Sequence, residues 1–321
     1  MKRIVSIIIL LIFCLCAVFL SACRKSTPEP VEVEHTHTLV PFVQNCDERH
    51  TDYIDGEAPF VDGLSLALKC EECGYTEPIE GELSYDETPL SCTDESFTVS
   101  CGGYEVEIPV NVKRVWRVAF AGDSLTAGAW DRRDMQYSIY VKKALRREVE
   151  IGNFGVSGIS VTGYGGLFGD PEMRYEKQTV FADCVDFAPD ILYIMLGTND
   201  SAGWDDAEPV FEENYRSLIG AFQAALPECE IVIVTTPPVG DGNKFLMPNG
   251  VITDCIVPIE KKLAEELGLP LLDANAILGS YEGGFDSLCI DGVHFSDVGA
   301  QYVGGIFTDK TVELTEDFLN E

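Results

Sequence analysis

Residues 115–128, VWRVAFAGDSLTAG, decide the fold of this 321-residue chain. The nearly continuous apolar run 115–121 is typical of a strand that is covered on both faces, and the run ends at Gly122. Similar runs follow at 149–154, 191–196 and 230–236, with a short one at 271–272. Apolar residues at helical spacing separate the runs: Tyr137, Val141, Ala144 and Leu145; Phe211, Tyr215, Leu218 and Phe222; Ile256, Ile259, Leu263 and Leu267. This alternation predicts an α/β fold, in which right-handed βαβ units surround a parallel sheet.

Polar patches follow these predicted strands. GDSLTAG (122–128) follows the first strand, NFGVSG (153–158) the second and GTND (197–200) the third, and DGVH (291–294) precedes the last predicted helix. A single patch of this kind is common, because turns favour Gly, Ser and Asp. Ligands of such folds bind beyond the carboxyl ends of the strands, where these patches meet. The four together therefore predict one site.

The residue types in the patches suit acyl transfer. Ser124 needs a base to take its proton, and His294 is the only histidine after residue 112. Asp291, three residues upstream, can hold the other imidazole nitrogen through one tight turn. The backbone N–H groups of Ser124 and Gly158 and the side-chain amide of Asn199 can donate to a tetrahedral oxyanion.

Asp123 precedes the serine. We expect its carboxylate to accept hydrogen bonds that hold the loop together, rather than to act as a second acid.

The four patches resemble the sequence blocks of the SGNH (GDSL) hydrolases, and the resemblance covers essentially all of residues 115–321. It implies that Ser124 is the nucleophile, His294 the base, Asp291 its orienting acceptor, and Gly158 and Asn199 oxyanion donors. It also implies a three-layer α/β/α sandwich of the SGNH, flavodoxin-like type, with about five parallel strands and no metal or organic cofactor.

The longer strings RVAFAGDSLTAG and ILYIMLGTNDS are similar to the branch of sialate or carbohydrate O-acetylesterases. Phe295 departs from that branch, which often has proline after the histidine. The chain contains no G-x-S-x-G motif, which argues against an α/β-hydrolase elbow.

Composition limits the functions further. The chain has 22 Lys and Arg against 54 Asp and Glu, a formal net charge of −32 that repels phosphate backbones and excludes a nucleic-acid function. A hydrophobic share of 46% with 24% charged residues excludes wholesale disorder, and the length predicts two domains.

The N-terminus is typical of an export signal. Lys2 and Arg3 precede an apolar run, and LSAC at 20–23 resembles a bacterial lipobox, in which Cys23 would carry the lipid. We expect a lipoprotein signal over 1–23, a tether over 24–34, and anchoring to the extracytoplasmic face of the bacterial membrane. An uncleaved membrane helix is the alternative.

Residues 35–112 are expected to form a small β-rich module ahead of the hydrolase domain at 113–321. From about Gly81, apolar and polar residues alternate around a turn at 101–103. Cys70 and Cys73 have the spacing of a zinc pair, which a histidine could complete; disulfides and free thiols are equally open. The module contains the following cysteines and histidines: Cys46, Cys70, Cys73, Cys92, Cys101, His35, His37 and His50.

The sequence thus predicts a surface-anchored serine esterase that removes small acyl groups, acetyl first among them, from small-molecule or glycan esters. Trp130, Trp204 and Tyr164 are candidates for stacking on a sugar, although aromatic residues there are more often half-buried packing residues. Two alternatives stay open: a lipolytic or thioester acylhydrolase, and a lipoprotein whose N-terminal module binds glycan or metal. The oligomeric state stays undetermined.

Overall fold

The computed structural model describes residues 36–129, 132–165 and 169–320. The predicted signal, the tether, Cys23, His35 and Trp130 lie outside these residues. Among the residues described, no helix combines the length and apolar character needed to cross a membrane.

A five-stranded parallel sheet organises the C-terminal part of the chain, as the sequence predicts. Its strands run in the order β10-β9-β11-β12-β13, and every neighbouring pair is parallel. Their bounds are β9 Trp116–Gly122, β10 Val149–Gly155, β11 Ile191–Met195, β12 Glu230–Val234 and β13 Leu271–Leu272.

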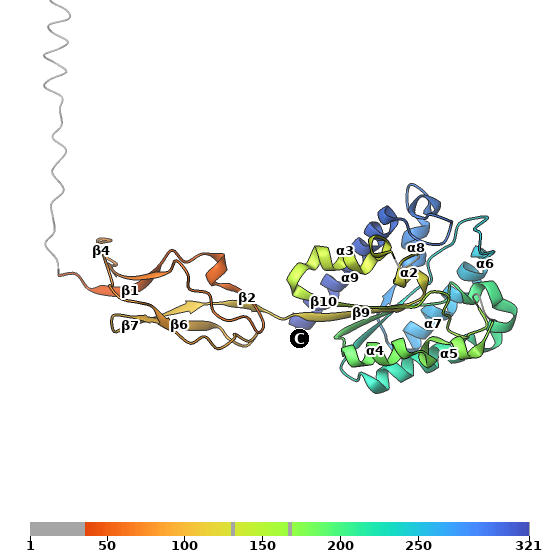
Figure 1. Cartoon of the computed structure of the whole chain (residues 1–321), viewed down its shortest axis with the longest axis horizontal. Coiled ribbons are helices and arrows are strands. Elements are labelled where there is room, and N and C mark those ends of the chain that lie inside the picture. Colours follow the sequence, from red (N-terminus) through yellow and green to blue (C-terminus); the bar gives the residue numbers. More distant parts are fainter. Residues whose placement is uncertain (1–35, 130–131, 166–168, 321) are drawn as a thin grey trace, which may run out of the picture. The chain divides into compact units, whose positions relative to one another are not determined.

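Helices cover both faces of this sheet, so the predicted three-layer sandwich is confirmed. The chain moves from β9 to β10 in one direction and then reverses through β11, β12 and β13. Right-handed crossovers therefore place α3 (Tyr137–Leu145) on one face and α4 (Thr179–Phe187), α5 (Trp204–Ala225) and α7 (Val257–Leu267) on the other. The last helix, α9 (Asp297–Asn320), packs against α3 on the first face (Figure 1). The reversal places the topological switch point between β9 and β11, at the carboxyl ends of these strands, where such folds bind ligands.

Shorter helical segments lie between these elements. They are α2 (Ser124–Ala127), α6 (Asn249–Val251), the π-helical turn Ile252–Ile256, α8 (Ala274–Gly279), and 3-10 turns at Glu48–His50, Arg133–Met135, Arg146–Glu148, Pro171–Met173, Tyr175–Lys177, Asp200–Gly203 and Phe285–Leu288.

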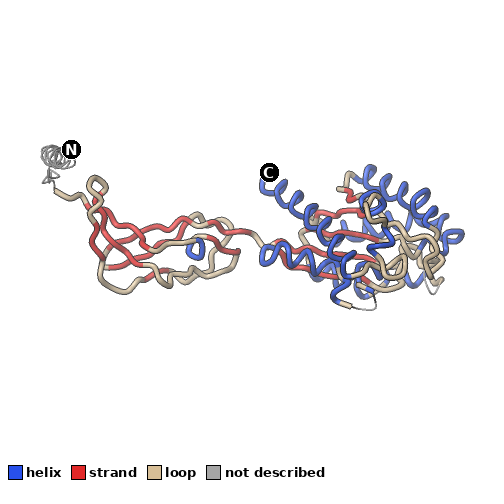
Figure 2. The backbone as a smooth tube through the Cα atoms, turned by 90° about the horizontal axis from the view of Figure 1, so that it is seen from above, coloured by secondary structure: helices blue, strands red, loops and turns tan. Residues whose placement is uncertain are grey.

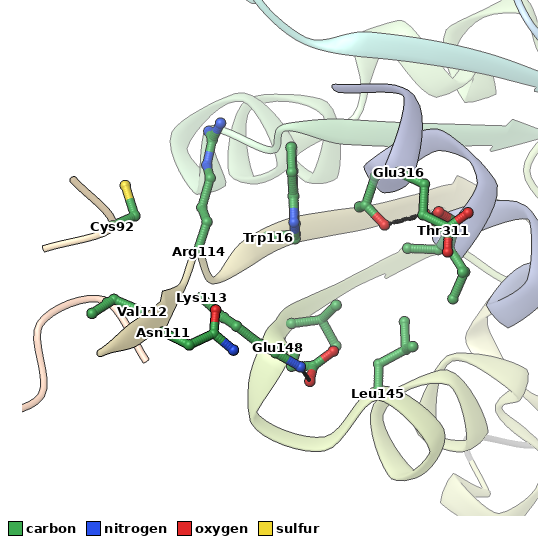
Figure 3. A pocket seen from close by; sticks show the side chains of 13 residues that line it. Cys92, Asn111, Val112, Lys113, Arg114, Trp116, Leu145, Glu148, Thr311 and Glu316 are labelled. Carbon is green, nitrogen blue, oxygen red and sulfur yellow. Dashed lines mark hydrogen bonds and ion pairs between the residues drawn. The ribbon is translucent and has the colours of Figure 1, made fainter. Parts of the chain in front are cut away.

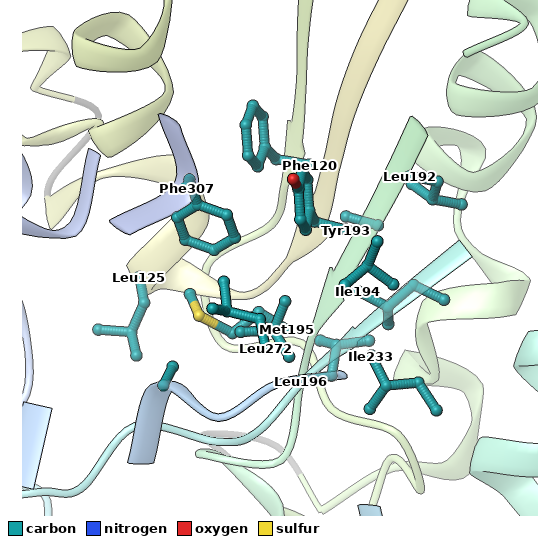
Figure 4. Packing of buried hydrophobic residues seen from close by; sticks show 14 of the residues in the cluster. Phe120, Leu125, Leu192, Tyr193, Ile194, Met195, Leu196, Ile233, Leu272 and Phe307 are labelled. Atoms are coloured by element: carbon teal, nitrogen blue, oxygen red, sulfur yellow. The ribbon is translucent and has the colours of Figure 1, made fainter. Parts of the chain in front are cut away.

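Aromatic rings fill the layer between the sheet and the α3–α9 face. Phe120 of β9 stacks on Tyr193 of β11, with ring centroids 5.3 Å apart. Phe307 of α9 meets both rings edge-on and stacks on Tyr137 of α3 at 4.7 Å. Figure 4 shows Phe120, Tyr193 and Phe307 grouped in this way. The packing fixes β9, and hence the loop that follows it, against the helical layer.

Strands dominate the chain before β9 (Figure 2). β1 (Leu39–Gln44), β3 (Ser65–Cys70) and β4 (Thr76–Pro78) form an antiparallel sheet, β2 (Asp52–Ile54) pairs in parallel with β8 (Asn111–Lys113), and β5 (Ser84–Tyr85), β6 (Ser96–Cys101) and β7 (Tyr104–Pro109) form a third sheet. A β-rich region therefore precedes the α/β domain, as predicted, and Gly102 and Gly103, both with positive φ, turn the chain between β6 and β7.

The chain divides into two compact units. One comprises the described residues up to Asn45 with Gly63–Ser84 and Val99–Val106. The other comprises Cys46–Asp62, Tyr85–Thr98 and the described residues from Glu107 onward. The predicted domain boundary after residue 112 stays a prediction.

Candidate active site

Ser124 lies where β9 ends and the short helix α2 begins. The buried Asp123 caps α2, because its Oδ1 accepts the N–H of Leu125 at 2.9 Å. Burial raises the pKa of Asp123 to about 6, against the opposing effect of this hydrogen bond. The capped turn presents Ser124, which is partly exposed, at the carboxyl end of the sheet.

The structure brings Ser124, His294 and Asp291 into one hydrogen-bonded row. Ser124 Oγ lies 2.9 Å from His294 Nε2, and His294 Nδ1 lies 2.8 Å from Asp291 Oδ2. An ionised Asp291 only accepts, so Nδ1 carries the imidazole proton and Nε2 is left to accept from the serine hydroxyl. This is the arrangement in which an imidazole activates a serine nucleophile.

A tight turn positions the two residues of the DGVH motif. Asp291 Oδ1 accepts the backbone N–H groups of Val293 at 3.0 Å and of His294 at 2.8 Å. Burial acts to raise the pKa of Asp291, but these bonds and the one from the imidazole outweigh it, and the net pKa is below the ordinary value. Asp291 is therefore a carboxylate at neutral pH, as an orienting acceptor must be.

The loops that carry Gly158 and Asn199 lie against each other. Asn199 Nδ2 donates one hydrogen to the carbonyl of Ile159 at 2.8 Å, which leaves its second N–H for another acceptor. Gly158 has a φ of 78°, so the turn before Ile159 suits a glycine. The predicted oxyanion donors are thus joined through one hydrogen bond next to Gly158.

Asp200 holds the same two loops together, a role that the sequence did not predict. Its carboxylate accepts the N–H groups of Val161 and Thr162 at 3.0 and 2.9 Å, and the Thr162 hydroxyl at 2.7 Å. Burial raises the pKa of Asp200 to about 6, while these donors oppose the rise. In the sequence, this role was indicated by the position of Asp200 at the end of the GTND motif.

Asn153 also holds neighbouring segments of the site together, and the sequence did not predict this role. Its side-chain amide donates to the Thr126 carbonyl at 2.7 Å and to Ser138 Oγ at 2.9 Å, and its Oδ1 accepts the N–H of Gly155 at 3.1 Å. A Cβ on Gly155 would lie only 2.2 Å from the backbone nitrogen of Ala127. The NFG part of the second motif therefore packs the end of β10 against the helix that begins at Ser124.

Phe245 contacts the base directly and was not predicted. Its ring meets the His294 imidazole edge-on at 5.2 Å, and the side chain is 38% exposed. Asn243 shapes this loop: its Oδ1 accepts the N–H groups of Phe245 and Met247 at 3.2 and 3.1 Å. Leu246, next to Phe245, is 86% exposed. In the sequence, the apolar run 245–247 within a loop was the feature that could have indicated this contact.

Two of the aromatic candidates for sugar stacking, Trp204 and Tyr164, differ in their exposure to solvent. Trp204 is 9% exposed and packs edge-on against Phe211 at 5.4 Å, so it is a core residue of α5 rather than a platform. Tyr164 is 38% exposed, and its backbone carbonyl adjoins Gly203.

The cysteine candidates lie far from Ser124 in the sequence. Cys46, Cys73, Cys92 and Cys101 of the predicted N-terminal module are free thiols. Cys70 and Cys73 do come together with His37, such that one ligand atom from each lies within 4.8 Å of the others.

A cavity of about 510 Å³ opens at the opposite end of the sheet. Trp116 and Val149, the first residues of β9 and β10, line it. Figure 3 shows Trp116 together with Thr311 of α9. No residue of the four motifs contributes to its wall. The hydrogen-bonded row therefore lies at the carboxyl edge of the strands, whereas this cavity lies at the amino edge.

Several known proteins are similar to parts of this chain. The sequence model of the GDSL-like lipase/acylhydrolase family matches residues 120–302. The acetylxylan esterase of Xylanibacter ruminicola is 27% identical over 225 residues, which cover 64% of this chain and 45% of that protein. The uncharacterized lipoprotein YqeF of Bacillus subtilis is 31% identical over 134 residues, 39% of this chain and 50% of that one. The match thus spans about half the length of either relative. Among solved structures, a lipase/acylhydrolase from Enterococcus faecalis superposes with a TM-score of 0.47 at 22% identity, over 61% of this chain and 94% of that one.

Proposed function

The chain belongs to the GDSL-like lipase/acylhydrolase family, and from this premise we propose that it is a serine esterase with Ser124 as nucleophile. The observation that carries the proposal is the unbroken row from Asp291 through His294 to Ser124, with contacts of 2.8 and 2.9 Å. A nucleophile, a base and an acceptor that orients the base are the parts that acyl transfer from an ester requires.

The row supports a two-step reaction. Ser124 Oγ attacks the ester carbonyl carbon while His294 Nε2 takes the hydroxyl proton, and Asp291 stabilises the imidazolium that forms. The tetrahedral intermediate collapses when His294 returns the proton to the leaving alcohol, which leaves an acyl-Ser124 ester. Water then attacks this ester while His294 takes a proton from it, and His294 returns that proton to Ser124 Oγ as the carboxylic acid departs.

Three donors serve the oxyanion in this proposal. They are the backbone N–H groups of Ser124 and Gly158 and the Asn199 amide hydrogen that does not bond Ile159. Asp200 and Asn153 hold the loops that carry these donors and therefore act as positioning residues. Fixed donors need no reorganisation when charge develops on the oxygen, which makes them effective in catalysis.

The proposed substrate is a carbohydrate that carries small acyl esters, acetyl above all. The relative named acetylxylan esterase supports this class. The exposed ring of Tyr164, on a loop that adjoins the segment after Asn199, offers an apolar face on which a sugar can pack.

The proposed location is outside the cell, on a lipid anchor at Cys23. The LSAC tetrapeptide at 20–23 supports it, as does the relative named as a lipoprotein.

A long-chain acyl substrate is the second candidate, because Phe245 and Leu246 place exposed apolar surface beside His294. The two candidates are separated by hydrolysis of the p-nitrophenyl esters of acetate, butyrate and octanoate, followed by acetate release from acetylated xylan. We expect kcat/KM to be highest for acetate and the rate to fall by about 10⁴-fold or more in Ser124→Ala.

The matched control is Ser280→Ala, which removes an exposed hydroxyl just after the end of α8 and should leave the rate unchanged. A preference for octanoate with no acetate release from xylan would replace the carbohydrate substrate by a lipid. Hydrolysis that survives in Ser124→Ala would refute the serine mechanism.

A further inference from the structure

His37, Cys70 and Cys73 form a cluster that the esterase reaction does not use. One ligand atom from each, an imidazole nitrogen and two thiol sulfurs, lies within 4.8 Å of the other two, and Cys73 Sγ is 3.3 Å from His37 Nδ1. Cys70 is 1% exposed, whereas His37 and Cys73 are exposed. The cluster lies wholly within the first compact unit, among β1, β3 and β4.

Strand pairing brings these residues together across a long stretch of sequence. β1 and β3 are antiparallel with Leu39 opposite Cys70, so the chain just before β1 lies beside the turn that follows β3. His37 is two residues before Leu39, and Cys73 lies in that turn. The register of the sheet therefore fixes the proximity, which does not depend on a chance meeting of surface side chains.

The turn after β3 has a shape that directs both sulfurs to one side. The N–H of Gly74 donates to the carbonyl of Cys70 at 2.8 Å, and the N–H of Cys70 donates to the carbonyl of Tyr75 at 2.8 Å. Gly74 has a φ of 77° and would meet nothing with an added Cβ, so its backbone conformation and not space favours glycine. The chain reverses immediately after Cys73 and returns as β4.

The imidazole is oriented by a ring on the same turn. Tyr75 stacks on His37, with centroids 4.7 Å apart and planes 17° from parallel. This contact holds the histidine over the turn with Nδ1 directed at Cys73.

We propose that His37, Cys70 and Cys73 bind a zinc ion that joins the N-terminal strand to the β3–β4 hairpin. Bonds of about 2.3 Å to sulfur and about 2.0–2.1 Å to nitrogen, at tetrahedral angles, separate a ligand sulfur from a ligand nitrogen by about 3.6 Å and two sulfurs by about 3.8 Å. The 3.3 Å between Cys73 Sγ and His37 Nδ1 is close to the first of these separations, and all three ligand atoms lie within 4.8 Å of one another. A disulfide would instead require the two sulfurs to approach to about 2.0 Å.

Ligand chemistry selects zinc. Two thiolates and an imidazole form a set that zinc prefers, while calcium and magnesium take oxygen ligands. A further ligand from the chain or from water completes a tetrahedron. The ion would be structural, because the sheet of β1, β3 and β4 has only six, six and three residues in its strands, and a small unit of this kind gains much from a cross-link.

The test measures metal content in the full-length chain, purified in detergent without chelators, by inductively coupled plasma mass spectrometry. We expect close to one zinc per chain in the wild type. His37→Ala and Cys73→Ser change exposed side chains and should each lose most of this zinc. The matched control, Cys92→Ser, changes an exposed cysteine outside the cluster and should keep it.

Two further measurements, of esterase activity and of cobalt absorption, accompany the zinc analysis. Hydrolysis of p-nitrophenyl acetate, whose site lies in the other unit, checks that the hydrolase unit of each variant is folded. Failure of that activity in every sample would concern the esterase and not the metal. Cobalt substituted for zinc should give a thiolate-to-metal absorption band that weakens in Cys73→Ser.

Wild-type protein without zinc after incubation with the ion under reducing conditions would overturn the proposal. So would full zinc retention in His37→Ala and Cys73→Ser, or a peptide that joins Cys70 to Cys73 through a disulfide in the native protein.

Discussion

His294 links the other groups of the proposed site, since one nitrogen faces Ser124 and the other faces Asp291. The sequence predicted this row because His294 has no rival after residue 112 and because a three-residue separation from Asp291 suits one turn. It did not predict the contact of Phe245 with the imidazole, because a contact between a loop and a residue so far along the chain leaves no periodic pattern in the sequence.

Asp291→Asn tests whether Asp291 orients the His294 imidazole, because the substitution replaces one carboxylate oxygen by an amide nitrogen. The amide can present its N–H to Nδ1 and so favour the tautomer that cannot accept from Ser124. We expect kcat to fall by about 10⁴-fold, with the thermal unfolding midpoint nearly unchanged. Steady-state kinetics alongside calorimetry checks this, and a fall of less than tenfold would contradict the role.

Asn199→Asp tests the oxyanion role with little change of shape. A carboxylate cannot donate to the oxyanion and repels it, so we expect kcat to fall by at least about 10²–10³-fold while KM changes little. Asn199→Ala should show a similar loss of kcat. A rise in KM at constant kcat would instead indicate that Asn199 binds the substrate in its ground state.

At the scale of elements, the strands of the central sheet were predictable, because burial on both faces demands uninterrupted apolar runs. The sequence predicted a strand at 149–154, and the structure has β10 at Val149–Gly155. It predicted another at 191–196, and the structure has β11 at Ile191–Met195. β1 was not predicted. It is an edge strand that contains Pro41, and a proline within a run argues against a strand unless the strand lies at an edge.

Helix α7 carries a buried acid that predicts a pH effect on stability. Glu260 is fully buried; its Oε2 accepts the N–H of Thr236 at 2.8 Å, and its Oε1 lies 2.7 Å from Thr236 Oγ1. That hydroxyl also lies 3.0 Å from the Leu196 carbonyl, and it has one hydrogen to give. A protonated Glu260 satisfies both contacts, since it donates to Thr236 while Thr236 donates to Leu196.

Burial raises the pKa of Glu260 from 4.5 to about 8, against the effect of the Thr236 bonds. Between these values the folded protein retains a proton that the unfolded chain has lost. The free energy of unfolding should therefore decrease as pH rises from 4.5 to 8.

Glu260→Gln keeps the donors and acceptors but cannot ionise, so the decrease should be smaller by more than about 1 kcal/mol. Urea unfolding across this pH range measures it. Equal pH dependence in the two proteins would show that Glu260 does not titrate there.

At the scale of the whole molecule, the sequence predicted a β-rich region ahead of an α/β domain. It did not predict that the first unit is built from three separate segments of the chain. Pairings between segments far apart in sequence, such as β1 with β3, depend on the register of the folded sheet. For the same reason, the spacing of Cys70 and Cys73 indicated a possible metal pair but could not select His37 among the histidines.

The predicted lipid anchor at Cys23 would attach the whole protein to the membrane. In Cys23→Ser the lipid attachment point is lost, so we expect the protein to move from the detergent-rich to the aqueous phase in a Triton X-114 partition, and metabolic labelling with palmitate to disappear. Esterase activity should be retained, because Ser124 is unaffected. Continued labelling of Cys23→Ser would refute the lipobox.

Covalent labelling with an alkyl fluorophosphonate tests the proposed nucleophile most directly. The reagent phosphonylates an activated serine with loss of fluoride, and peptide mass spectrometry locates the adduct. We expect a single adduct on Ser124, equally fast in the Ser280→Ala control, abolished in Ser124→Ala and strongly slowed in His294→Ala. An adduct on another serine, or labelling of Ser124 that does not depend on His294, would contradict the proposed row of Ser124, His294 and Asp291.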